Sequence, residues 1–349
     1  MTALEYQPLV LIETADLPEE EWLEYRRKGI GGSDAAAVLG VSPFATARDI
    51  YYDKLHQIPY EDQEDNWVAK KIGHLLEDLV AEIFRVKTGY RIYQIKKMFY
   101  HPVHTFMLAD VDYFVTLPDG TTAILEIKTT NYNAKEHWYY NGQPIVPVNY
   151  EIQGRHYMCV MNVDHVFYCC LYGNNEQECL IRHIERDMDY ESELIALEKD
   201  FWHNHVLARI PPPYTEDGDL IIASVRRQYG LANEDAPAVL LGADMSVCMQ
   251  RYLELQARKA AMKAEIDKVE REMKRLRGFV IAEMGRSCTA SCSIGAEPYT
   301  ITYKPIHKTT IEKNKLLQLK ERHPDIYAEY VTTSESRRFD VKKSKQEAA

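Results

Sequence analysis

The chain of 349 residues contains little that would mark a membrane protein or an exported one. No apolar run approaches the ~20 residues that a membrane span needs, and no basic, apolar leader opens the sequence. Cysteine is sparse: the seven residues are odd in number and form no CxxC pair. This spacing argues against a disulfide framework and against zinc or iron–sulfur ligation. We therefore expect a cytoplasmic protein with reduced thiols and no membrane contact.

Basic residues are too few to balance the acidic ones. There are 42 Lys and Arg against 53 Asp and Glu, so the formal net charge is −11. Taken alone, this charge argues against a nucleic-acid partner. The distribution is uneven, however: residues 245–349 hold 21 basic and 14 acidic residues, a net of +7, and subtraction leaves −18 in residues 1–244. Such asymmetry indicates two tasks, and carboxylates of the acidic part could bind a metal ion.

The composition, 46% hydrophobic and 27% charged, excludes a fibrous or mostly disordered chain. Hydrophobic periodicity predicts a folded domain in residues 1–210. Predicted helices cover residues 16–29, 66–88, 149–161 and 188–207, with a short helix after Ser33, and predicted strands cover 91–100, 105–116, 122–128, 164–172 and 178–186. The apolar stripe of the longest of these helices comprises Ile72, Leu75, Leu76, Leu79, Val80 and Ile83. This order predicts an α/β (α+β) fold with a mixed central β-sheet flanked by helices.

Beyond residue 210 the pattern changes. A triple proline opens residues 211–243, whose weak periodicity predicts a linker or peripheral segment. In residues 244–285, apolar residues recur in alternating steps of three and four, interrupted at Lys259, which predicts a long heptad helix. That helix is either one arm of a helical pair within the monomer, which we favour, or part of an intermolecular coiled coil. Residues 286–349 form a small basic C-terminal region.

This C-terminal region is expected to contain a strand at 296–305, a short helix at 310–322 and a loose Lys-rich end. Its lysines have two interpretations. They could contact the phosphate backbone of a nucleic acid, which would make affinity salt-dependent, or they could be an ordinary solvated surface. The residues concerned are Lys304, Lys308, Lys313 and Lys315.

The residues that carry chemistry are Asp112 and, fourteen positions later, Glu126-Ile127-Lys128. Glu126 and Lys128 stand at i and i+2 of a predicted strand, so both side chains point to one face. The turn Leu117-Pro118-Asp119-Gly120 folds the strand of Asp112 back beside them. Two carboxylates and an ammonium would then converge, which suits Mg²⁺ or Mn²⁺ with a lysine beside the bound water. The alternative is an ion-pair face at the surface.

Four further residues extend this set. Glu77 is a charged residue in an apolar stretch of the helix 66–88, and Gln153 lies on an apolar helix where a partly buried amide needs a partner. Arg26 and Ser33 flank a glycine-rich stretch that would let backbone amides approach a phosphate closely. Glu77 could also be a solvated helix position, and the glycine-rich stretch could be a capped structural turn.

Together these motifs resemble a known family. In chain order they are Trp22-x3-Arg26, Ile30-Gly31-Gly32-Ser33-Asp34, Gly73-x3-Glu77, Ala109-x2-Asp112, Leu125-Glu126-Ile127-Lys128 and Gln153. The set resembles the YqaJ-type viral recombinases, which belong with phage lambda exonuclease in the PD-(D/E)xK nuclease superfamily. The resemblance covers roughly residues 20–205 and depends on the order and spacing of six short motifs. It implies that residues 1–210 form a nuclease domain with a restriction-endonuclease-like core.

The resemblance also implies a set of metal ligands. Asp112 and Glu126 would bind one or two Mg²⁺ ions together with the backbone carbonyl of Ile127, and Mn²⁺ would substitute. Glu77 would complete the site directly or through water. The superfamily often shows Ser-Pro-Asp-Gly around the first aspartate, whereas this chain has Asp-Val-Asp-Tyr there. Asp110, the first acid of that sequence, is therefore a lesser candidate ligand.

The remaining roles follow from the same resemblance. Lys128 would position the attacking water, Gln153 would support that lysine or the nucleophile, and Arg26 and Ser33 would hold a 5′-terminal phosphate. The implied enzyme is a 5′→3′ exonuclease that digests one strand of linear double-stranded DNA to mononucleotides. It would leave 3′ single-stranded DNA for homologous recombination by strand annealing.

Further properties are implied by the resemblance alone. They are a trimeric ring, a single-strand annealing protein as partner, and location in the cytoplasm of a bacterial or phage-infected cell. Two alternatives remain open. A RecB- or Cas4-like repair nuclease usually calls for a fused helicase or iron–sulfur cysteines, and neither is visible in the sequence. The second alternative is a non-catalytic DNA-binding scaffold, and the complete set of carboxylates and lysine argues against it.

Overall fold

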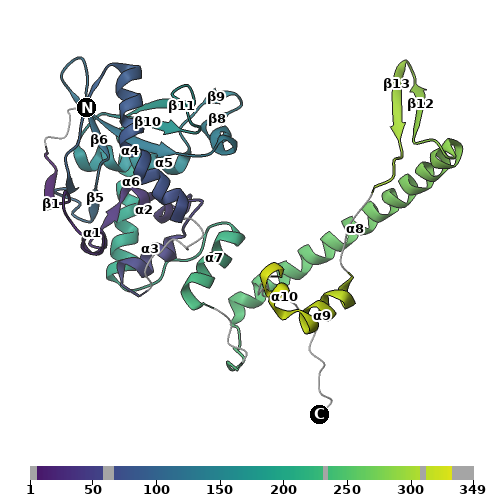
Figure 1. Ribbon diagram of the computed structural model, residues 1–349. Helices are drawn as coiled ribbons and strands as arrows, with labels where there is room; N and C mark the ends of the chain where they lie inside the picture. The colour runs from purple at the N-terminus through teal and green to yellow at the C-terminus, as the bar shows by residue number, and fades with distance from the viewer. Residues whose placement is uncertain (1–5, 58–66, 231–234, 307–311, 332–349) are drawn as a thin grey trace, which may run out of the picture. The chain divides into compact units, whose positions relative to one another are not determined.

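The computed structural model describes residues 6–57, 67–230, 235–306 and 312–331 (Figure 1). The chain divides into two compact units, Met1–Ala236 and Pro237–Ala349. The first unit contains two mixed sheets with helices packed against them, which confirms the predicted fold class. No helix among the described residues is long and apolar enough to cross a membrane.

The larger sheet carries the candidate site. Its five strands lie in the order β11-β10-β7-β6-β3. The pair β7 and β10 is parallel and the other pairs are antiparallel. The strands are β3 (Arg91–Tyr93), β6 (Tyr113–Thr116), β7 (Thr122–Thr129), β10 (His165–Leu171) and β11 (Cys179–Glu185). The tight turn between β6 and β7 contains Gly120 at φ +88°, a conformation that glycine adopts without strain, so the predicted hairpin is confirmed.

The smaller sheet corrects two strand predictions. Its order is β1-β4-β5-β2, with strands β1 (Leu9–Glu13), β2 (Ile30–Gly31), β4 (Lys97–Tyr100) and β5 (Met107–Ala109). The expected single strands 91–100 and 105–116 are therefore each divided between the two sheets. In the second case the break falls at residues 110–112, where two aspartates use their carboxylates in side-chain hydrogen bonds. Aspartate is disfavoured within strands, and here it marks the crossover.

Two helices cover opposite faces of the larger sheet (Figure 1). Helix α4 (Trp67–Thr88) packs its buried residues Val80, Ala81 and Phe84 on one face, where Leu125 and Ile127 of β7 point. Helix α5 (Val148–Met161) packs on the other face and also contacts β5 of the smaller sheet. Because side chains alternate along β7, Glu126 and Lys128 project towards α5.

The predicted buried stripe of α4 is partly wrong. Leu75 and Leu79 are 69% and 51% exposed, and Ile72 is 45% exposed. The face turned to the sheet instead runs along the buried positions 80, 81 and 84, and helical spacing of three and four extends it back to Glu77. A charged residue therefore shares the core-facing stripe of the helix, which a search for apolar periodicity does not detect.

Further helices complete the first unit: α1 (Glu19–Arg26), α2 (Gly32–Val38), α3 (Ala47–Lys54), the 3₁₀ helix η2 (Tyr132–Trp138), α6 (Met188–Asp200), the π-helix η3 (Phe201–Leu207) and α7 (Gly218–Tyr229). A short hairpin, β8 (Tyr139–Tyr140) and β9 (Gln143–Pro144), follows η2. Residues 218–229, which fall in the segment predicted as a linker or peripheral segment, form helix α7, and this helix packs against α3. Arg227 Nη2 donates to Asp49 Oδ2 of α3 at 2.6 Å, and Ser224 Oγ donates to Asp49 Oδ1 at 2.9 Å. The contacts are polar, so apolar periodicity did not predict this packing.

The second unit contains α8 (Ala243–Met284), the hairpin β12 (Thr289–Ile294) and β13 (Glu297–Thr302), and helices α9 (Lys313–Arg322) and α10 (Pro324–Tyr330). The predicted heptad helix, the strand at 296–305 and the helix at 310–322 correspond to α8, β13 and α9, although residues 310 and 311 lie outside the described ones. Strand β12 and helix α10 were not predicted. The Lys-rich end and Lys308 also lie outside the described residues. Within this unit, no described element covers the heptad seam of α8, so the favoured helical pair is not found there.

Candidate active site

The crossover between the two sheets places Asp112 beside β7. Tyr113 pairs with Leu125 in the β6–β7 ladder, so the preceding Asp112 lies next to Glu126. Its carboxylate accepts a hydrogen bond from the backbone amide of Ile127, from N to Oδ2 at 2.8 Å. The hairpin thus brings the two predicted carboxylates together, as the sequence spacing indicated. The strand that carries Glu126 and Lys128 lies inside the sheet between β6 and β10, which fixes both side chains on one face.

Glu126, Lys128 and Gln153 form a closed set of hydrogen bonds. Lys128 Nζ donates to Glu126 Oε1 at 2.6 Å and to Gln153 Oε1 at 3.1 Å. Gln153 Nε2, on α5, donates to the same Glu126 Oε1 at 2.5 Å. The second carboxylate oxygen, Oε2, is buried and has no hydrogen-bond partner among the described residues. An orphaned carboxylate oxygen of this kind is what a bound hard cation would satisfy.

Burial and mutual repulsion raise the pKa values of the acids in this cluster. Burial and the neighbouring Asp112 raise the pKa of Glu126 to about 8, and the same two causes raise the pKa of Glu77 to about 7. Burial also raises the pKa of Asp112. For Lys128, burial opposes the charged form, but the neighbouring Glu126 and Asp112 outweigh it and raise the pKa. Acids that resist ionisation next to a single ammonium form a site in which a divalent cation would relieve like-charge repulsion.

The carboxylates fit a metal by their chemistry but are not preassembled around one. Among the described residues, no group of three or more His, Cys, Asp or Glu side chains is arranged to hold a metal ion. The reason is that Glu126 Oε1 faces Lys128 and Gln153, and Asp112 Oδ2 faces a backbone amide. Coordination by Glu77, Asp112 and Glu126 would therefore require side-chain rotation. The ligand role of the Ile127 carbonyl stays a prediction.

A cavity of about 390 Å³ connects the acidic cluster to the predicted phosphate site. Its lining includes Glu77, Asp112 and Gln153 together with Arg26 and Ser33. Five of the predicted positions thus line one cavity, and Glu126 and Lys128 are hydrogen-bonded to Gln153 in its lining. Further lining side chains, whose roles sequence reasoning did not assign, are His74, Lys96 and Tyr157. His74 lies three residues before Glu77 on α4, and that helical spacing was the signal that could have found it.

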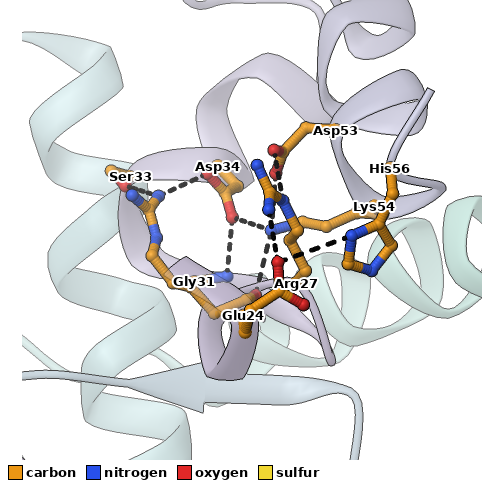
Figure 2. A network of polar contacts seen from close by, with 9 residues as sticks. Glu24, Arg27, Gly31, Ser33, Asp34, Asp53, Lys54 and His56 are labelled. Carbon is orange, nitrogen blue, oxygen red and sulfur yellow. Dashed lines mark hydrogen bonds and ion pairs between the residues drawn. The ribbon is translucent and has the colours of Figure 1, made fainter. Parts of the chain in front are cut away.

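The predicted phosphate ligands belong to a buried ionic network (Figure 2). Arg26 Nη2 donates to Ser33 Oγ at 2.5 Å and to Asp34 Oδ1 at 2.6 Å. Lys54 Nζ donates to Asp34 Oδ2 at 2.7 Å and to the Arg26 carbonyl at 3.1 Å, and the Gly31 amide donates to Asp34 Oδ2 at 3.1 Å. Burial opposes ionisation of Asp34, but Arg26 and Lys54 outweigh it and lower its pKa to about 2.

This network holds the guanidinium of Arg26 at the wall of the cavity. The Lys54 side chain is 1% exposed and that of Arg26 is 23% exposed, so the support is buried while the arginine reaches the open space. The sequence placed Asp34 only in the motif Ile30-Gly31-Gly32-Ser33-Asp34, without a role, and gave no indication of Lys54, which stands twenty positions further along the chain. No local motif connects the two.

Asp110, the lesser metal candidate, has a different partner. Trp22 Nε1 donates to Asp110 Oδ2 at 2.7 Å, and the Trp22 ring lies 5.2 Å from the Arg26 guanidinium. Burial raises the pKa of Asp110 despite this hydrogen bond. Its carboxylate therefore connects the crossover to α1, and a ligand role for it stays a prediction.

Comparison with known proteins gives matches at both the sequence and the structure level. A family model described as the YqaJ-like viral recombinase domain matches residues 21–164. The Bacillus subtilis (strain 168) protein YqaJ is 30% identical over 336 residues, covering 95% of this chain and 97% of that protein. Among solved structures, the alkaline exonuclease LHK-Exo from Laribacter hongkongensis is 19% identical, with a TM-score of 0.45 over 55% of this chain and 94% of that one.

A phage-related exonuclease from Haemophilus somnus 129PT is 12% identical, with a TM-score of 0.38 over 52% of this chain and 96% of that one. The likeness to these two solved structures is therefore weak. The relationship to YqaJ, in contrast, extends over nearly the full length of both chains. On this evidence, the chain belongs to the YqaJ-like viral recombinase family.

Proposed function

We propose that the protein is a Mg²⁺-dependent 5′→3′ exonuclease that digests one strand of linear double-stranded DNA. The observation that carries this proposal is the hydrogen-bonded set of Glu126, Lys128 and Gln153 beside Asp112, at a cavity that also exposes Arg26. Acids and a guanidinium that line one cavity, with an ammonium hydrogen-bonded to Gln153 of that lining, suit a chain of phosphates. Membership of a recombinase family supports the same substrate.

Glu77, Asp112 and Glu126 would hold the metal, with the orphaned Glu126 Oε2 as one ligand atom. When bound, Mg²⁺ would lower the pKa of a water molecule and neutralise charge on the scissile phosphate. The protein supplies the orientation. Lys128 is held between Glu126 and Gln153, so its ammonium can fix a water for in-line attack and stabilise charge on the phosphate. Gln153 keeps that ammonium in place.

Arg26 and Ser33, which line the same cavity, would receive the 5′-terminal phosphate. The buried carboxylate of Asp34 orients the guanidinium, and Ser33 lies beside it. A site for a terminal phosphate would set where the strand stops and therefore which bond is cleaved. The product would be a nucleoside 5′-monophosphate, and the complementary strand would remain as a 3′ single strand. A trimeric ring and an annealing protein that receives this strand are part of the same proposal.

The proposal is tested by a strand-polarity assay. Linear duplex labelled at one end is incubated with the protein and Mg²⁺, once with a 5′-phosphate and once with a 5′-hydroxyl. The proposal predicts mononucleotide release from the 5′-phosphorylated end, and slower release from the 5′-hydroxyl end. Release from 3′ ends, or cleavage of covalently closed circles, would favour a RecB- or Cas4-like repair nuclease. The absence of any cleavage by a folded, Mg²⁺-binding protein would favour a non-catalytic scaffold.

A further inference from the structure

The long helix α8 carries an apolar seam that is exposed to solvent. The apolar residues at the a and d positions of its heptads, from Met245 to Val280, have exposed fractions between 38% and 64%, and Cys248 is exposed as well. The seam consists of Met245, Cys248, Tyr252, Leu255, Lys259, Met262, Ile266, Val269, Met273 and Leu276, followed by Val280. No described element of the second unit covers it. A helix of 42 residues normally depends on packing along such a stripe.

We propose that the seam binds the same seam of a second copy of this chain, as an antiparallel two-stranded coiled coil. The charges beside the seam carry this inference. The g positions flank the core of a coiled coil, and its four central ones are Arg251 and Arg258 in the first half of the helix and Glu265 and Glu272 in the second, while Asp244 and Phe279 occupy the g positions at the two ends. This division is self-complementary only when two helices run in opposite directions, because g positions then meet g positions.

The antiparallel register pairs every core position from Met245 to Leu276. Met245 lies opposite Leu276, Cys248 opposite Met273, Tyr252 opposite Val269, and Leu255 opposite Ile266, and symmetry repeats each layer. In the same register, Arg251 meets Glu272 and Arg258 meets Glu265, so symmetry gives four attractive pairs. Lys259 lies opposite Met262, and Glu265 of the second copy is within one turn of its ammonium. The stem of a lysine can pack in such a layer while its charge reaches the rim.

A parallel pair would place like charges together. There, each g position meets the following e position of the second helix. Arg258 would meet Lys263, Glu265 would meet Glu270, and Lys259 would face its own copy in one core layer. Only Glu272 and Arg277 would attract each other. The charge pattern therefore selects the antiparallel arrangement.

This assembly goes beyond the proposed nuclease function, because it involves the second unit alone. It joins two chains through α8 whatever the first units form among themselves. In the antiparallel register the N-terminal ends of the two helices, where each first unit is connected, lie at opposite ends and roughly 50 Å apart. The coiled coil would thus connect two candidate active sites in one particle.

Cysteine cross-linking in the full chain tests the arrangement, in a background with Cys288→Ser and Cys292→Ser. Met273→Cys places a thiol opposite the native Cys248 of the second copy, so a short thiol-to-thiol linker should give a covalent dimer. Without Met273→Cys, the two Cys248 side chains lie roughly 37 Å apart along the pair and should not react. The matched control is Arg271→Cys, which places the thiol on the outer face of the same turn and should also give no dimer. Dimers through Cys248 alone, or none with Met273→Cys, would overturn the proposal.

Charge reversal provides the second measurement. Arg251→Glu with Arg258→Glu makes all four central g positions acidic and should lower the dimer affinity of the cross-linking variant at least about tenfold. Equimolar mixing with a chain carrying Glu265→Arg and Glu272→Arg should restore cross-linking between the two chains. The control, Arg271→Glu with Lys274→Glu, changes the net charge equally on the outer face and should have little effect. Stronger association of the acidic variant would indicate the parallel pair and contradict the proposal.

Discussion

Asp34 should contribute strongly to stability because its carboxylate neutralises Lys54 in the interior. We consider Asp34→Asn, which keeps the shape of the side chain and removes its charge. The depression of the pKa from 3.8 to about 2 corresponds to about 2 kcal/mol of stabilisation. Asp34→Asn leaves the Lys54 ammonium, whose side chain is 1% exposed, with only the more distant carboxylate of Asp53 at 3.8 Å, which raises the expected loss towards the ~3–5 kcal/mol typical of a broken buried pair. We therefore expect Asp34→Asn to cost about 3 kcal/mol.

Thermal and denaturant unfolding of the full chain would measure this loss through the transition of the first unit. For a unit of this size, about 3 kcal/mol corresponds to a fall in Tm of roughly 6–12 °C. The double variant Asp34→Asn with Lys54→Met should recover much of the stability, because it leaves no buried charge unpaired. Asp53→Asn is the matched control: this carboxylate is more exposed, pairs with Arg27 at 2.9 Å and lies 3.8 Å from Lys54, so its loss should cost less.

The difference in free energy of unfolding between wild type and Asp34→Asn should depend on pH, in the direction set by the lowered pKa of Asp34. The pKa of Asp34 is lower in the folded state than in the unfolded state, so its contribution is present above about pH 4 and is lost as pH falls towards about 2. The difference in free energy of unfolding between wild type and Asp34→Asn should therefore decrease as the pH falls from about 4 to about 2. A difference in free energy of unfolding below about 0.5 kcal/mol at pH 7, or a difference that does not change as the carboxylate is protonated, would refute the reasoning.

Two further predictions concern the acidic cluster and α7. The pKa of Glu126 is raised from 4.5 to about 8, so in metal-free protein its stabilising contribution is present below about pH 4.5 and is lost as pH rises through about 8. The stability of wild type relative to Glu126→Gln should fall across that pH range. The affinity for Mg²⁺, measured calorimetrically, should rise over the same range, and an affinity that does not depend on pH would contradict the prediction. Arg227→Ala leaves Asp49 without a charged partner and should destabilise the first unit by about 2 kcal/mol in denaturant unfolding, with early proteolysis near α7. An unchanged unfolding midpoint would show that α7 contributes nothing to the unit.

The sequence predicted the centre of the candidate site because local geometry determines it. Alternation along one strand places Glu126 and Lys128 together, and a two-strand hairpin with a glycine turn returns Asp112 to them. These relations involve neighbours within twenty residues, where strand and turn geometry leave few choices. The mixed sheet between helices followed in the same way from the order of the elements.

What the sequence did not predict depends on long-range or polar contacts. Lys54 reaches Asp34 from another helix, Trp22 reaches Asp110 across the crossover, and α7 packs through Ser224. None of these contacts leaves an apolar period in the sequence. The division of residues 91–100 and 105–116 between two sheets was missed for a similar reason, because both segments have the residue types of a continuous strand.

The central claim is that Lys128 acts in metal-dependent hydrolysis of duplex DNA. Its most direct test is single-turnover degradation of 5′-phosphorylated linear duplex by wild type and Lys128→Ala, with Mg²⁺ and with a chelator. Lys87→Ala, which removes an exposed lysine of α4, is the matched control. We predict that wild type and the control degrade the duplex only with Mg²⁺, and that Lys128→Ala loses activity on the order of 100-fold or more while remaining folded. Undiminished degradation by Lys128→Ala, or degradation by wild type in the chelator, would contradict the account.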